Sequence, residues 1–233
     1  MNVAGKSIII IGDSHSAGGG LGAFGPTLKA ELEAKGATVR LLAKGGTASA
    51  NWLKPDKLAP VAGQTFDLAI IALGTNDAAN ANRAAGEYGR NLNSELSTAV
   101  TSIEKLADRL ALDFIWVGPP PMGNKTKWYS QKVMDALYDK ALPVFGQKAI
   151  DSRPLATSGM LGDGVHYGTS GAKAWAQKVA ARFAGGSSEV APQNSDHGGS
   201  SSAESAPSLM PIILLVAVGI LFFGGRRARP FAR

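Results

Sequence analysis

Three short polar stretches of this 233-residue chain contain the residue types that acyl transfer requires. The first, G-D-S-H-S, places Ser14 shortly after four consecutive isoleucines. The second, G-T-N-D, contains Asn76, and the third, D-G-V-H, contains Asp163 and His166. Ester hydrolysis needs a nucleophile, a base, a group that holds the base, and donors for the oxyanion. The three stretches supply a candidate for each of these parts.

The spacing of Asp163 and His166 suits a carboxylate that orients an imidazole. Across one tight turn the carboxylate can accept a hydrogen bond from one ring nitrogen and leave the other free for a serine hydroxyl. Ser14 is the candidate nucleophile, although serine and aspartate are also ordinary turn and cap residues. The catalytic candidates are therefore Ser14, Asp163 and His166.

Two kinds of group are candidates for stabilising the oxyanion. Asn76 offers a side-chain amide, and the K-G-G-T stretch offers a backbone N–H from Gly45, or from Gly46, that no side chain obstructs. Gly46, Trp52 and Tyr167 are further candidates for substrate binding. The two aromatic rings are candidates because such rings stack on sugars. For the two aromatic residues, plain packing in the core is an equal alternative.

Several other features have ordinary explanations. Asp77 is predicted to stabilise its own loop, and His15 to point away from Ser14. Gly18–Gly20 lacks the lysine and the Ser/Thr of a phosphate-binding loop. The chain has no cysteine and three histidines, so we expect neither a cysteine-ligated nor a histidine-rich metal site.

The elements that must position these residues alternate along the chain. Apolar runs predict strands at 7–11, 38–43, 67–73, 114–117 and 149–150, and apolar periodicity predicts helices from 25 to about 36, over 92–110, 130–142 and 169–183. Alternating strands and helices favour a parallel sheet covered on both faces. Ligands of such sheets bind at the carboxyl ends of the strands, where the candidates lie.

Four blocks in this order resemble the SGNH hydrolases, the GDSL-type esterases and lipases. The blocks are G-D-S-H-S, K-G-G-T, G-T-N-D and D-G-V-H, and the match spans residues 7–184. The resemblance implies a flavodoxin-like three-layer α/β/α sandwich with a parallel sheet of about five strands and no cofactor. It also implies a catalytic triad of Ser14, Asp163 and His166, and an oxyanion hole formed by Ser14 N–H, Gly45 and Asn76.

The chain divides by composition into a domain and a tail. We expect a hydrolase domain over 1–185, a flexible linker over 186–207, a transmembrane anchor over 208–225 and a basic tail over 226–233. The span from Pro207 to Gly225 gives a helix of roughly 28 Å, close to the thickness of a bilayer's hydrocarbon core. A buried core helix is the alternative.

The expected location is a membrane with a single C-terminal anchor. No signal peptide is expected, because Met1 to Lys6 lead directly into the first apolar run. The arginines after the span would prefer the cytoplasmic side, which conflicts with a domain made in the cytoplasm. A cell envelope membrane and a virion membrane both stay open.

The function that these features favour is serine-dependent hydrolysis of small acyl esters, such as acetyl groups on cell-wall or other polysaccharide. A lipase or phospholipase acting on membrane lipids is one alternative, and a non-catalytic, membrane-tethered binding protein is another. The net charge of +6 forms no stripe typical of nucleic-acid binding, so the expected partners are an ester substrate and a lipid bilayer.

Overall fold

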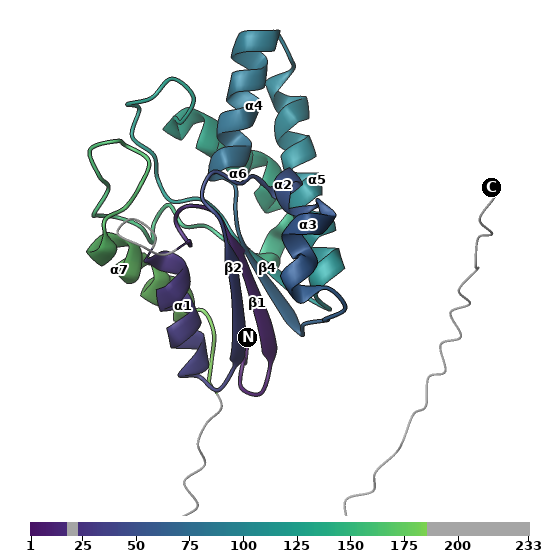
Figure 1. The fold of residues 1–233 in the computed structure, drawn as a ribbon. Helices are drawn as coiled ribbons and strands as arrows, with labels where there is room; N and C mark the ends of the chain where they lie inside the picture. Colours follow the sequence, from purple (N-terminus) through teal and green to yellow (C-terminus); the bar gives the residue numbers. More distant parts are fainter. Residues whose placement is uncertain (18–22, 186–233) are drawn as a thin grey trace, which may run out of the picture. The chain divides into compact units, whose positions relative to one another are not determined.

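The computed structural model describes residues 1–17 and 23–185 of the chain. Five parallel strands form one sheet in the order β2-β1-β3-β4-β5 (Figure 1). The strands are β1 (Ser7–Gly12), β2 (Thr38–Ala43), β3 (Leu68–Ala72), β4 (Phe114–Val117) and β5 (Ala149–Ile150). The expected number, order along the chain and parallel direction of the strands are confirmed.

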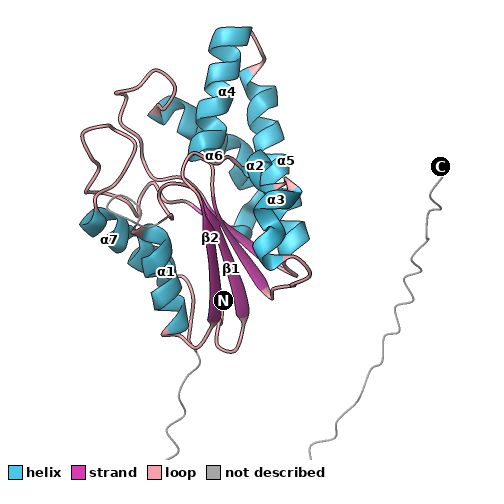
Figure 2. Ribbon diagram, viewed as in Figure 1, coloured by secondary structure: helices cyan, strands magenta, loops and turns pink. Residues whose placement is uncertain are grey.

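Helices cover both faces of the sheet and give the three layers (Figure 2). The longer helices are α1 (Phe24–Glu33), α4 (Thr75–Tyr88), α5 (Leu92–Leu110), α6 (Gln131–Phe145) and α7 (Thr169–Ala180). Short helical turns form α2 (Ser49–Trp52), α3 (Pro55–Leu58), η1 (Ala59–Val61) and η2 (Gly146–Lys148). Helices α1 and α7 lie on one face, and α5 and α6 on the other.

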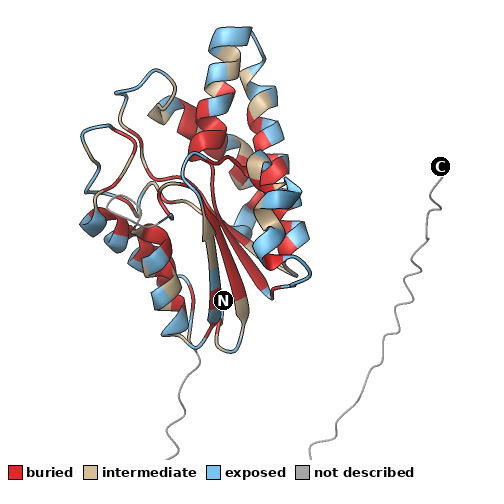
Figure 3. Cartoon of the chain, in the orientation of Figure 1, coloured by how far each residue is buried: buried red, intermediate tan, exposed pale blue. Residues whose placement is uncertain are grey.

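The four isoleucines of β1 explain why the sheet has a core on each side. Successive strand residues point to opposite faces, so Ile8 and Ile10 pack against α1 and α7, while Ile9 and Ile11 pack toward α5 and α6. All four are fully buried, as Figure 3 shows for the central strands. A continuous apolar run is what a strand covered on both faces requires.

One of the longer helices, and the short α2 and α3, were not expected from the sequence. Helix α4 begins at Thr75, shortly after β3, and the only apolar side chains that it buries are those of three alanines. These small side chains give no strong apolar periodicity, so the pattern did not reveal the helix. Its first turn contains Asn76 and Asp77, which therefore lie at a helix N-terminus and not in a loop.

The expected C-terminal segments lie outside the described residues. This holds for the linker (186–207), the membrane anchor (208–225) and the basic tail (226–233), and also for Gly18–Gly20. Within the part that the structure describes, no helix has the length and apolar character needed to cross a membrane.

Candidate active site

Ser14, His166 and Asp163 form one hydrogen-bonded row. Ser14 Oγ lies 3.0 Å from His166 Nε2, and His166 Nδ1 lies 2.7 Å from Asp163 Oδ2. Ser14 follows β1 in a turn, and the other two residues lie on the loop that leads into α7. The fold thus brings together side chains that are 152 positions apart.

The row is partly open to solvent. The side chain of His166 is 25% exposed and that of Asp163 is 45% exposed, so a substrate can approach them. Burial raises the pKa of Asp163, but hydrogen bonds from the His166 ring and from the Val165 and His166 N–H groups outweigh it and lower that pKa to about 2. Asp163 is therefore a carboxylate at neutral pH and fixes the tautomer of His166 with the proton on Nδ1.

Local hydrogen bonds hold Ser14 in its turn. Asp13 Oδ1 accepts from His15 N–H at 3.0 Å, and Ser16 N–H donates to the Asp13 carbonyl at 3.1 Å. Ser14 is half-buried between residues that are buried on both sides. Among the described residues, Asp13 Oδ2, His15 Nε2 and Ser16 Oγ have no hydrogen-bond partner. The residues on either side of the candidate nucleophile therefore bury polar atoms that lack hydrogen bonds, and this lowers the stability of the fold.

The two glycines of the K-G-G-T stretch have different surroundings. A Cβ placed on Gly45 would lie 3.8 Å from Ser14 Cβ, whereas one on Gly46 would meet nothing within 4 Å. Gly45 is thus the glycine beside Ser14. Gly46 has a φ of +74°, which makes the turn after β2.

Asn76 lies at the same end of the sheet and is buried. Its Nδ2 donates to the Thr47 carbonyl at 3.1 Å, and its Oδ1 accepts from the Tyr129 hydroxyl at 3.0 Å. The neighbouring Asp77 accepts from both the N–H and the hydroxyl of Ser49. Asp77 therefore ties the start of α4 to the start of α2. This is a structural contact, as predicted, but it joins two helices instead of stabilising a loop.

Burial shows that the prediction of substrate binding by the two aromatic candidates is wrong. Trp52 is 4% exposed and its Nε1 donates to Thr47 Oγ1, while Tyr167 is 1% exposed and its hydroxyl donates to the Pro121 carbonyl. Neither ring offers a free face to a sugar. Both pack as core residues because their polar atoms find partners inside the protein.

His15 is also buried, and it lies nearer to the row than expected. Its ring centroid is 5.6 Å from that of His166, and it contacts Trp175 edge-on. Burial, and next the neighbouring His166, lower the pKa of His15 to about 3, so it is neutral at pH 7. Sequence reasoning did not find the contact of Tyr129 with Asn76, because nothing in the chain signals a hydrogen bond between residues 53 positions apart.

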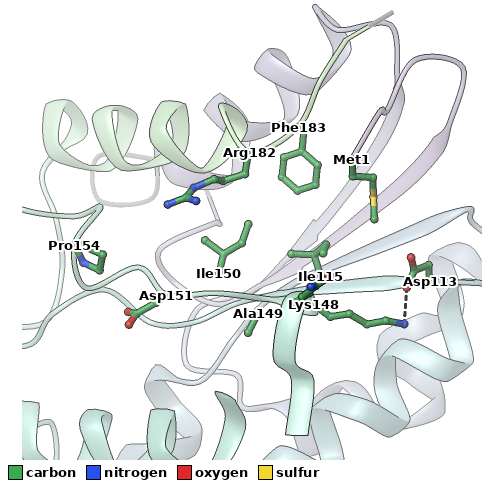
Figure 4. Close-up of a pocket in the computed structure, with 11 residues that line it drawn as sticks. Met1, Asp113, Ile115, Lys148, Ala149, Ile150, Asp151, Pro154, Arg182 and Phe183 are labelled. Carbon is green, nitrogen blue, oxygen red and sulfur yellow. Dashed lines mark ion pairs between the residues drawn. The ribbon is translucent and has the colours of Figure 1, made fainter. Parts of the chain in front are cut away.

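A separate cavity of about 670 Å³ lies beside β4, β5 and the end of α7 (Figure 4). Its lining includes Ile115, Ile150, Arg182 and Phe183, and none of the catalytic candidates. Groups of acidic and histidine side chains suited to a metal ion are absent from the described part of the chain.

Comparison with known proteins identifies the family to which the chain belongs. The model of the GDSL-like lipase/acylhydrolase family matches residues 10–174. The chain belongs to this family. This GDSL-like protein is accordingly a carboxylic ester hydrolase, as the sequence predicted. No curated protein sequence matches it.

Solved structures share the fold of this GDSL-like protein at low identity. LAE5, an alpha/beta hydrolase enzyme from the metagenome of Lake Arreo, is 18% identical, with a TM-score of 0.59 over 77% of this chain and 95% of its own. The acetylxylan esterase Axe2 of Geobacillus stearothermophilus is 18% identical, with a TM-score of 0.56 over 76% and 93%. A putative arylesterase of Agrobacterium tumefaciens is 22% identical, with a TM-score of 0.56 over 76% and 97%.

Proposed function

We propose that the chain is a serine esterase that removes small acyl groups, acetyl above all, from carbohydrate. The observation that carries the proposal is the continuous row from Ser14 Oγ through His166 to Asp163, with contacts of 3.0 and 2.7 Å. These are the distances at which a base can take the proton of a serine hydroxyl.

In the proposed reaction, Ser14 Oγ attacks the ester carbonyl carbon while its proton passes to His166 Nε2. The oxyanion is stabilised by the N–H groups of Ser14 and Gly45 and by the amide of Asn76. The bond to the alcohol oxygen then breaks, and the alcohol leaves with the proton from His166. Water attacks the acyl-enzyme carbonyl and gives a proton to His166, which forms a second tetrahedral intermediate. This intermediate collapses as the bond between the acyl carbon and Ser14 Oγ breaks, Ser14 Oγ takes the proton back from His166, and the acid leaves.

The loop beside the row supports a polar substrate. Gly123 N–H donates to the Gly164 carbonyl at 2.7 Å, and a Cβ added to Gly164 would lie 3.2 Å from Lys125 Cβ. Gly123 and Lys125 therefore lie beside the turn between Asp163 and His166. The segment from Gly123 to Lys127 reads G-N-K-T-K, and residues 124–127 are exposed. An acyl pocket for long chains needs apolar walls, which this loop lacks. Axe2, which has the same fold, is an acetylxylan esterase, and this agrees with a carbohydrate ester as substrate.

The first test replaces the nucleophile. Ser14→Ala should lower kcat/KM on p-nitrophenyl acetate by at least about a thousandfold while the melting temperature is retained. Ser97→Ala, an exposed serine on α5, is the matched control and should stay at the wild-type rate. A fluorophosphonate probe should label wild type and Ser97→Ala but not Ser14→Ala. Failure of the probe to label folded wild-type protein would favour a non-catalytic binding protein.

The second test is acyl-chain length. A lipase gains about 0.8 kcal/mol for each CH₂ group that it buries, so its rate rises with chain length. We expect kcat/KM to be highest for acetyl esters and to fall with longer chains. A strong preference for chains beyond about eight carbons would contradict a carbohydrate esterase and favour a lipase, because only a long apolar pocket gains from them.

We also propose that residues 208–225 anchor the protein in a membrane. Fifteen uncharged residues from Leu209 to Phe223 and the following basic tail support this assignment. Replacing Val216 and Val218 by arginine should release the full chain from bilayers on carbonate extraction, because each arginine costs about 3 kcal/mol at the centre of a membrane helix. Wild type that is released in the same way would contradict the anchor.

A further inference from the structure

The amide of Asn76 is bonded at both ends, and the two bonds settle its orientation. The atom facing the Thr47 carbonyl, 3.1 Å away, must be Nδ2, because a carbonyl oxygen only accepts. The atom facing the Tyr129 hydroxyl at 3.0 Å is then Oδ1, so the tyrosine donates. The amide therefore cannot rotate by half a turn without losing both bonds and placing two oxygens against each other at Thr47.

This orientation leaves one donor of Asn76 for chemistry. An amide nitrogen carries two N–H groups, and Thr47 takes one of them. The second has no acceptor among the residues that the structure describes. A donation from Tyr129 to Oδ1 also polarises the amide, which strengthens the remaining N–H as a donor. The tyrosine thus acts on orientation and on donor strength together.

The segment that carries Tyr129 is fastened to the helix that carries Asn76. Asn82 Nδ2, on α4, donates to the Trp128 carbonyl at 3.0 Å. The Trp128 ring lies against α4 at Gly86, where an added Cβ would come within 3.0 Å of it. Asn76 is part of α4, and Tyr129 follows a residue that is bonded to α4. The tyrosine hydroxyl and the Asn76 amide are therefore held at a fixed position relative to each other.

The hydroxyl of Tyr129 is in the state that it needs to donate. Tyr129 is half-buried, and burial, with a smaller effect from the nearby Asp13 carboxyl, raises its pKa above the ordinary value. The phenol therefore keeps its proton across the neutral range.

We propose that Tyr129 is a positioning residue that aims the free N–H of Asn76 at the oxyanion. This inference rests on the proposed esterase function and deepens it. Tyr129 acts through Asn76 and does not itself contact the substrate's reacting atoms. A purely structural tyrosine, which only holds its loop, predicts a different pattern of rates, because its loss would affect activity whether or not the Asn76 amide is present.

The experiment is a double-mutant cycle on the full chain with p-nitrophenyl acetate as substrate. Asn76→Ala should lower kcat by about a hundredfold or more, as loss of an oxyanion donor does elsewhere. Tyr129→Phe should lower kcat by about tenfold with KM within about twofold of wild type, because orientation acts in the transition state. The double variant should match Asn76→Ala within about twofold, since Tyr129 has nothing left to position.

Matched controls separate the possible outcomes. Tyr88→Phe removes the hydroxyl of an exposed tyrosine at the end of the same helix and should leave kcat and KM unchanged. The inference is overturned if Tyr129→Phe keeps the wild-type kcat, or if it lowers the rate of Asn76→Ala by the same factor as in wild type. Melting temperatures of all variants identify any that fail to fold, and Tyr129→Trp then provides a second variant that keeps the loop filled but removes the hydroxyl.

The same set of variants distinguishes failure of the inference from failure of the function. If Ser14→Ala retains activity, the proposed nucleophile is wrong, and the inference fails with it. If Ser14→Ala is inactive but Asn76→Ala has the wild-type rate, the oxyanion assignment is wrong and the inference again fails. If both variants lose activity as expected and Tyr129→Phe does not, only the role of Tyr129 is wrong.

Discussion

Two buried aspartates at the carboxyl ends of the strands differ from two more exposed aspartates at the amino ends. Near the amino ends of the strands, Asp67 accepts from the N–H and hydroxyl of Ser7, and Asp113 pairs with Lys148 at 2.7 Å. Hydrogen bonds from these partners lower the pKa of both carboxyls. At the carboxyl ends, Asp13 and Asp77 are 1% and 5% exposed, and burial raises the pKa of each.

The difference in burial between these two pairs of aspartates has a consequence for stability. A carboxylate in water that accepts hydrogen bonds closes a turn at little cost, whereas a buried carboxyl costs stability unless its partners are complete. Asp13 holds the turn of Ser14, and Asp77 links α2 to the helix of Asn76. Asp13 and Asp77, whose burial costs stability, are thus found where backbone segments must be held beside the site, and the more exposed Asp67 and Asp113 lie near the points where strands begin.

The largest effect expected from this comparison is on activity. Asp163→Asn should lower kcat/KM by about 10³ to 10⁴, because an amide at this position no longer fixes the tautomer that leaves Nε2 free for Ser14. Asp113→Asn, the same change at the amino end, should leave kcat/KM within about twofold of wild type because it lies far from the row. Steady-state rates on p-nitrophenyl acetate test both, and equal losses in the two variants would contradict the division between the ends.

The next effect is on stability. Asp77→Ala should lower the free energy of unfolding by about 2 to 3 kcal/mol, because it leaves the N–H and hydroxyl of Ser49 buried without their acceptor. Asp67→Ala removes bonds that water replaces, so its melting temperature should stay near wild type. Urea denaturation at pH 7 measures the difference. Similar losses at the two positions would mean that burial does not distinguish them.

These contrasts also mark what sequence reasoning predicted well. The strands at 38–43, 114–117 and 149–150 have the predicted bounds, because short apolar runs between breakers leave few alternatives. The closeness of Ser14 to His166 agrees with the expectation that chemistry gathers at the carboxyl ends of parallel strands. The local sequence was enough to predict the bounds of these three strands.

Other features depend on contacts that no local pattern contains. Helix α4 buries alanines, which carry too little hydrophobic contrast to reveal a helical face. Trp52 and Tyr167 carry polar atoms that suit a binding site as well as a core, and only their partners Thr47 and Pro121 decide for the core. The bond from Tyr129 to Asn76 arises from packing of a loop against α4, which sequence spacing does not encode.

A third effect is on the pH dependence of stability. Burial, with a smaller contribution from Asp77, raises the pKa of Asp13 to about 7, against about 4 in an unfolded chain. Between these values the folded protein binds more protons than the unfolded one, so this contribution is complete below about pH 4 and is lost as the pH rises to 7. Asp13→Asn removes the titrating group and therefore this loss. The free energy of unfolding of Asp13→Asn, relative to that of wild type, should increase from pH 4 to pH 8.

Asp67→Asn provides the matched control for this titration. The pKa of Asp67 is lowered, so its contribution is present above about pH 4 and is lost only as the pH falls further. The difference in free energy of unfolding between Asp67→Asn and wild type should therefore be constant from pH 5 to pH 8. A wild-type curve that runs parallel to that of Asp13→Asn across this window would show that Asp13 is ionised in the folded protein.

The smallest effect is expected at the ion pair between Asp113 and Lys148, at the edge of the cavity in Figure 4. Their side chains are 38% and 50% exposed, so solvent screens the pair. Asp113→Asn should cost at most about 1 kcal/mol at low salt, and this cost should disappear in 1 M NaCl. Denaturation at both salt concentrations tests this. A larger, salt-independent loss would mean that Asp113 behaves like the buried aspartates of the opposite end, and the two ends would then differ in position but not in kind.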